Sequence, residues 1–254
     1  MSHAAIDPVS GAMEWPYPLE YDRMDEIETD VLVIGGGASG CFAAMGASSR
    51  GARVVMMEKA ATLTSGAMGS GCDHWEMAAT NPCSKVTPED LADAMIRGHH
   101  GYNNGISHYI EAREGYDRLL DLERYGGKIR DTDDQFVGAD FRDDATKFMF
   151  AYDYENRFSL RVWGATFKAA MYRGAKQMKA QVLDRTMGAG LLTEGGRMGT
   201  RVVGAVAIDG RTGRFTVCRA KATVFCMSRP TRLWLFAPGA TGISEFRPPQ
   251  CTGD

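Results

Sequence analysis

Three glycines and one acidic residue have the types and spacing that point most directly to chemistry. Gly35, Gly37 and Gly40 form a G-x-G-x-x-G pattern, and Glu58 follows about 20 residues later. Glycines at this spacing permit a tight turn, a close approach of pyrophosphate to the backbone, and close packing of a following helix. The helix N-terminus offers N–H groups to phosphate, and the acid accepts hydrogen bonds from a ribose. The pattern therefore predicts a dinucleotide site.

The segments around these residues are those that such a site requires. Residues 31–34 are continuously apolar and β-branched, which is typical of a buried parallel strand. Residues 39–49 are small and compatible with a helix, and a second apolar run ends on Glu58. A glycine-rich turn without a ligand is the other interpretation, and the strand–helix–strand context favours the dinucleotide.

Composition excludes several classes of protein. The chain has 254 residues, of which 44% are hydrophobic and 24% charged, as in an ordinary globular protein. A net charge of −3 argues against a nucleic-acid binder. The six cysteines contain no C-x-x-C pair, so we expect no metal site, iron–sulfur cluster or disulfide framework. The N-terminus is no secretory signal and no apolar run reaches about 20 residues, which predicts a cytoplasmic protein without membrane insertion.

Four stretches resemble one known family of flavoproteins. Residues 30–60 ("DVLVIGGGASGCFAAMGASSRGARVVMMEKA") resemble the FAD fingerprint of the fumarate reductase/succinate dehydrogenase flavoprotein family, which includes the adenylylsulfate reductase α subunit. Residues 64–71 ("TSGAMGSG") are similar to its loop beneath the flavin ring, and residues 201–225 to its β-meander. The final "CTGD", residues 251–254, resembles the start of its T-G-D-G motif.

The resemblance implies FAD as the cofactor and places residues around it. The expected contacts are Gly35, Gly36, Gly37, Ala38, Ser39, Gly40, Glu58, Lys59, Thr64, Ser65, Gly66, Val182 and Asp254. Val182 would pass the adenine through backbone contacts. Many members carry a histidine bonded covalently to the flavin where this chain has Thr64, so we expect non-covalent FAD. One departure lies at residues 226–230 ("CMSRP"), where the family continues with an alanine-threonine-glycine-glycine turn.

The expected fold is α/β: a Rossmann-like FAD-binding domain with a parallel sheet, helices on both faces and a β-meander. Residues 1–28 are expected to be an N-terminal extension. Residues 29–254 would form the FAD-binding domain, incomplete and truncated before the capping domain, with an irregular helical excursion at about 87–160. Helices are predicted from Pro88, over 107–125 and over 166–179. The acidic run within 127–160 is expected to be a solvated face.

The resemblance implies the FAD-binding portion of an oxidoreductase that moves electrons between flavin and a small-molecule redox substrate. The resemblance also implies a possible iron–sulfur electron-transfer subunit as partner. Because this sequence has no pattern of cluster ligands, any such cluster is expected in another chain. The alternatives are an adenylylsulfate reductase-like electron-transfer subunit and a non-catalytic truncated remnant. Because the family's capping domain supplies the catalytic groups, no catalytic residue is assigned and it stays open whether this chain alone is an enzyme. His74 and Trp75 follow the flavin loop and either border the substrate or serve packing alone.

Overall fold

A computed structural model describes residues 15–101 and 103–227, which divide into two compact units. The first, here called the sheet unit, contains residues 15–62 and 178–227. The second, the helical unit, contains residues 63–177. Each unit is described by itself below.

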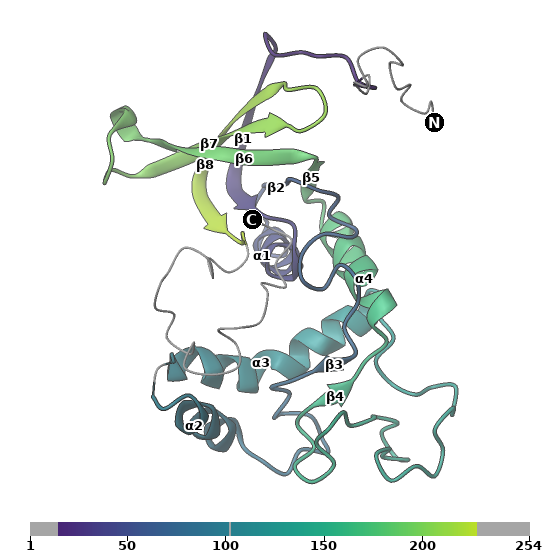
Figure 1. Cartoon of the computed structure of the whole chain (residues 1–254). Helices are drawn as coiled ribbons and strands as arrows, with labels where there is room; N and C mark the ends of the chain where they lie inside the picture. The colour runs from purple at the N-terminus through teal and green to yellow at the C-terminus, as the bar shows by residue number, and fades with distance from the viewer. Residues whose placement is uncertain (1–14, 102, 228–254) are drawn as a thin grey trace, which may run out of the picture. The chain divides into compact units, whose positions relative to one another are not determined.

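The sheet unit contains one helix and one six-stranded sheet (Figure 1). The strands lie in the order β5-β2-β1-β8-β7-β6. Their bounds are β1 Met24–Ile34, β2 Val54–Glu58, β5 Gln181–Asp184, β6 Thr186–Thr193, β7 Val202–Asp209 and β8 Phe215–Phe225, with α1 at Ala38–Ser48 and a short 3-10 turn at Glu194–Gly196.

Parallel and antiparallel pairing occupy different halves of this sheet. Strand β1 pairs in parallel with β2 and with β8, and β2 pairs in parallel with β5. Strands β6, β7 and β8 are antiparallel neighbours. This confirms the expected α/β fold with its β-meander.

Strand β1 begins earlier than the apolar run predicts. Its polar first half, Met24–Thr29, pairs with Phe215–Ala220 of β8, so the strand starts inside the segment expected to be an extension. The apolar second half pairs with β2 from Val31 to Ile34 and is buried on both faces. Helix α1 contacts β1 and β2 on one face. The other face carries the core cluster of Leu32, Ile34, Val55, Met57, Ala205, Ala207, Cys218 and Ala220.

The described residues of the helical unit contain three helices and a two-stranded antiparallel sheet. Helix α2 spans Pro88–Gly98, α3 Gly105–Arg124 and α4 Gly164–Gln177, and strand β3 (His74–Trp75) pairs with β4 (Leu160–Arg161). The start of α2 is confirmed, with a capping box between Thr87 and Asp90. Helix α3, predicted over 107–125, buries Leu119 and Leu122, whereas Ile110 is 43% exposed.

The irregular segment after α3 is ordered around a buried ion pair, so the expectation of a solvated acidic face is wrong for Asp131. The Asp131 side chain is fully buried, with its Oδ2 atom 2.8 Å from Nε of Arg142. Its Oδ1 atom accepts a hydrogen bond from the N–H of Gln135 and its Oδ2 atom one from Phe136. Burial raises the pKa of Asp131, but these hydrogen bonds and Arg142 outweigh it and hold the pKa below its ordinary value.

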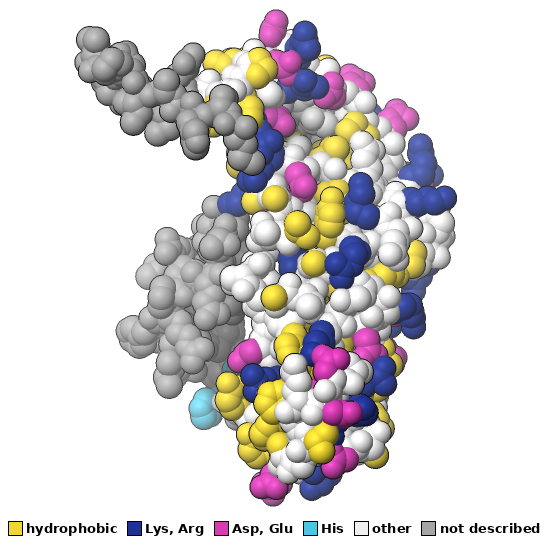
Figure 2. All heavy atoms as spheres, turned by 90° about the vertical axis from the view of Figure 1, so that its right-hand side faces the viewer, with side chains coloured by type: hydrophobic (Ala, Val, Ile, Leu, Met, Phe, Trp, Pro, Cys, Tyr) yellow, Lys and Arg dark blue, Asp and Glu magenta, His cyan; other side chains and the backbone are white. Residues whose placement is uncertain are grey.

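Charge on the surface is mixed in sign. On the face seen in Figure 2, basic side chains and acidic side chains both occur, with hydrophobic side chains scattered among them. None of the helices in the described ranges combines the length and apolar character that crossing a membrane requires.

Candidate functional site

The glycine pattern forms a tight loop at the carboxyl end of β1. Gly35 has φ +102°, and a Cβ atom there would lie 2.3 Å from the carbonyl oxygen of Cys226 at the end of β8. A Cβ atom on Gly40 would lie 1.8 Å from the carbonyl oxygen of Gly35. These two glycines are therefore required by the close approach of α1 and β8 to the loop.

Gly37 is different, because the backbone gives no reason for a glycine there. Its φ of −65° is open to any residue. Gly37 is the N-cap of α1, no side chain of the described structure caps this helix, and its first turn carries no acidic residue. Backbone N–H groups at an uncapped helix N-terminus attract an anion. The start of α1 is therefore compatible with the phosphate predicted beside Gly37.

Glu58 connects the end of β2 to the glycine loop. Its side chain is only 7% exposed. The Oε2 atom accepts a hydrogen bond from the N–H of Gly36 at 2.6 Å, and Oε1 accepts one from the N–H of Ala60 at 2.8 Å. The sequence predicted a role toward a ribose, whereas this structural role was missed. Each carboxylate oxygen has a further lone pair, so a ribose hydroxyl can still donate to Glu58.

Two residues without any motif support the same edge of the sheet. Thr62 donates from its N–H and from its Oγ1 to Oδ1 of Asp184, at 2.7 and 2.6 Å. The hydroxyl of Thr62 would lie 2.8 Å from a Cβ atom on Gly36. Val182 lies opposite Met56 in the parallel pairing of β5 with β2. The strand expected near an adenine is thus the neighbour of the strand that ends in Glu58, and Lys59 directly follows that acid.

The predicted flavin loop, residues 64–71, belongs to the helical unit. Thr64 is exposed, Ser65 is 8% exposed, and Gly66 has φ +79°. A Cβ atom on Gly69 would lie 1.9 Å from the carbonyl oxygen of Thr64. Part of the small-residue composition is therefore explained by the internal packing of the loop.

The carboxyl end of β8 departs from the family's pattern. Cys226 donates its N–H to the carbonyl oxygen of Ile34 at 2.8 Å, so the chain continues along β1 to this point. The predicted contact Asp254 and residues 228–230 lie outside the described residues.

FAD fits the residues of the sheet unit. The uncapped start of α1 suits a pyrophosphate, and the buried Glu58 retains acceptor capacity beside the loop. These groups have the chemistry that the phosphates and a ribose of a dinucleotide require.

Solved structures share this fold. Adenylylsulfate reductase from the hyperthermophilic Archaeoglobus fulgidus is 22% identical, with a TM-score of 0.70 over 89% of this chain and 35% of that one. Mycobacterium smegmatis Sdh1 in complex with UQ1 is 22% identical, with a TM-score of 0.65 over 80% of this chain and 34% of that one. E. coli quinol fumarate reductase FrdA is 16% identical, with a TM-score of 0.61 over 84% of this chain and 34% of that one. The chain spans about a third of the length of these structures.

No curated protein matches the chain in sequence. A family match covers nearly all of the chain, from residue 30 to residue 254, and its description is "FAD binding domain". The glycine loop, the start of α1 and Glu58 all lie within the matched range. The chain belongs to the FAD binding domain family, and FAD is its cofactor.

Proposed function

We propose that the chain holds FAD non-covalently and forms the FAD-binding portion of an oxidoreductase that moves electrons between flavin and a small-molecule substrate. The observation that carries this proposal is the hydrogen bond from the N–H of Gly36 to Glu58, beside the uncapped start of α1. It joins the phosphate loop to the ribose-binding acid in one buried unit. Bound FAD would supply the electron-transfer chemistry, and the protein positions it.

Each part of the cofactor has its own residues in this proposal. The N–H groups of Gly37, Ala38 and Ser39 bind the pyrophosphate at the start of α1. Glu58 accepts hydrogen bonds from the adenosine ribose, and the backbone around Val182 borders the adenine. Residues 64–66 contact the flavin ring, with Lys59 and Asp254 as further contacts. With threonine at position 64, this loop offers no imidazole for a covalent bond there.

For the substrate and the electron partner, only the general class is proposed. Among the described residues, no group of three or more His, Cys, Asp or Glu side chains could hold a metal ion. We propose an iron–sulfur electron-transfer subunit as the partner, and the cytoplasm as the location. An adenylylsulfate reductase-like electron-transfer subunit is the second candidate, since the solved adenylylsulfate reductase shares the fold as the fumarate reductase does.

A matched pair of glycine variants tests the cofactor site. Gly37→Leu places a bulky side chain at the proposed pyrophosphate, while Gly98→Leu makes the same change in α2, where a Cβ atom would have no atom within 4 Å. We expect the Gly37 variant to lose flavin while its far-UV circular dichroism stays native, and the Gly98 variant to retain it. Full flavin occupancy in Gly37→Leu would contradict the phosphate-loop assignment.

A further inference from the structure

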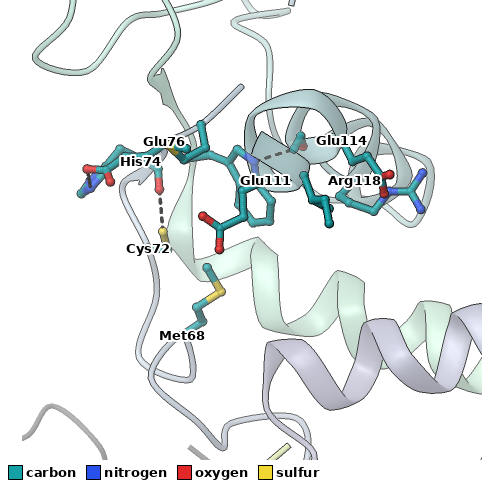
Figure 3. A pocket seen from close by; sticks show the side chains of 11 residues that line it. Met68, Cys72, His74, Glu76, Glu111, Glu114 and Arg118 are labelled. Carbon is teal, nitrogen blue, oxygen red and sulfur yellow. Dashed lines mark hydrogen bonds and ion pairs between the residues drawn. The ribbon is translucent and has the colours of Figure 1, made fainter. Parts of the chain in front are cut away.

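A pocket of about 560 Å³ lies within the helical unit, between residues 68–77 and helix α3 (Figure 3). Its volume falls within the range of roughly 300–1,000 Å³ that is typical of small-molecule sites. The lining residues are Met68, Cys72, His74, Trp75, Glu76, Met77, Ile110, Glu111, Glu114, Gly115 and Arg118. Four of these contribute large apolar side chains.

The wall of the pocket is held in place by specific contacts. The indole N–H of Trp75 donates to the carbonyl oxygen of Gly115 at 3.1 Å, and the Trp75 ring lies 5.6 Å from that of Phe167. A Cβ atom on Gly115 would lie 2.7 Å from the carbonyl oxygen of Met77, so a glycine is needed where this segment crosses α3. Met77 itself has φ +62°, a conformation that is uncommon for a side chain of its kind.

Two of the charged lining residues have strong partners outside the pocket. Glu114 accepts a hydrogen bond from Arg113 at 2.6 Å, which holds the pKa of Glu114 below its ordinary value. Arg118 pairs with Asp121 at 3.2 Å. In Figure 3 both Glu114 and Arg118 extend away from Met68. Their charges are therefore compensated on the outer side of α3.

Glu111 is placed differently. Its ion-pair partner in the described part of the chain is His108, at 3.2 Å from Nδ1, and not a Lys or Arg. Figure 3 shows the Glu111 carboxylate and the Met68 thioether pointing toward one another. Glu76, the remaining acidic lining residue, has its Oε1 atom 3.3 Å from Nε2 of His74. The pocket thus combines apolar side chains with the half-exposed carboxylate of Glu111, which faces Met68.

We propose that this pocket binds a small organic cation with an apolar body, with the cationic group beside Glu111 and the body against Met68 and Met77. A neutral analogue gains the burial of its apolar body but no attraction to the carboxylate. An anionic analogue is repelled by it. None of the lining residues is among those proposed to bind the pyrophosphate, ribose or adenine, although Met68 belongs to the predicted flavin loop. A cationic ligand goes beyond the proposed redox function.

Three probes of similar size test the charge preference. The purified chain, with any flavin that it carries, is labelled with carbon-13 at the methionine methyl groups and titrated at about pH 8. The probes are 2-phenylethylammonium, 2-phenylethanol and 3-phenylpropionate. Signals of Met68 and Met77 are assigned with Met68→Leu and Met77→Leu. We expect saturable shifts of both signals, with the ammonium binding most tightly and the carboxylate most weakly.

A matched pair of variants tests the role of Glu111. Glu111→Gln should raise the Kd of the ammonium probe about two- to fivefold, as expected for an exposed charge pair, and leave that of the alcohol unchanged. Asp117→Asn, which neutralises an exposed carboxylate of α3 outside the lining, should leave both Kd values unchanged. The proposal is overturned if neither methionine signal shifts saturably, if the three probes bind equally, or if both variants weaken the ammonium alike.

Discussion

Replacing Gly40 with alanine should destabilise the protein, although alanine is the better helix former. The added Cβ atom would lie 1.8 Å from the carbonyl oxygen of Gly35, and real Cβ contacts essentially never fall below 3.0 Å. Helix α1 or the loop must therefore shift by at least 1.2 Å, the difference between these distances. Overpacking of this kind costs about 1–3 kcal/mol, and the gain in helix propensity of about 0.5–1 kcal/mol offsets only part of it.

Gly46→Ala, in the same helix, is the matched control. There the nearest atom to the new Cβ is Nη1 of Arg50 at 3.8 Å, an ordinary contact. This variant should gain about 0.5–1 kcal/mol. The two variants should differ by about 2 kcal/mol, or about 4–8 °C in Tm followed by far-UV circular dichroism. Equal Tm values for the Gly40 and Gly46 variants would refute the close-packing role of Gly40.

Three further predictions concern acidic side chains. Glu58→Ala should lower both the stability of the protein and its FAD affinity, because it removes the acceptor of two backbone N–H groups. Urea unfolding measures the stability and flavin titration the affinity. An unchanged urea midpoint would mean that Glu58 serves only cofactor binding and does not stabilise the loop. Asp131→Asn should lower the Tm by about 5 °C because it removes the fully buried one of the three carboxylates that pair with Arg142 and leaves only the exposed Asp134 and Asp144, and a Tm within error of the parent would contradict this. Hydrogen bonding from Lys221 above all lowers the pKa of Asp30, so its contribution to stability is present above the ordinary pKa of about 3.9 and is lost as pH falls below it. Asp30→Asn should therefore flatten the acid limb of the stability–pH curve, and an identical limb would argue against the pair.

The spacing of residue types in the sequence was sufficient to predict the part of the site that is formed by residues close to one another in the chain. The glycine loop, α1 and β2 lie within one βαβ-like stretch, so the apolar runs and the position of Glu58 were sufficient. The capping box at Thr87 was recognisable for the same reason. These features need only contacts between residues close in the sequence.

Long-range contacts explain what the sequence did not reveal. Thr62 and Asp184 are 122 residues apart, and neither belongs to a motif. The polar first half of β1 is a strand only because β8 pairs with it. Asp131 is buried because Arg142 folds back onto it, while a run of charges in the sequence gives no sign of that pairing. The periodicity and composition of a sequence do not reveal which residues will pair across such distances.

The central claim is that this chain holds FAD without a covalent bond. The most direct measurement is the visible absorption spectrum of the purified chain, taken before and after acid denaturation and filtration. We predict flavin bands in the native protein and free flavin in the filtrate after denaturation. A folded but colourless chain that takes up no added FAD would contradict the cofactor site, and flavin retained with the denatured protein would contradict the non-covalent mode.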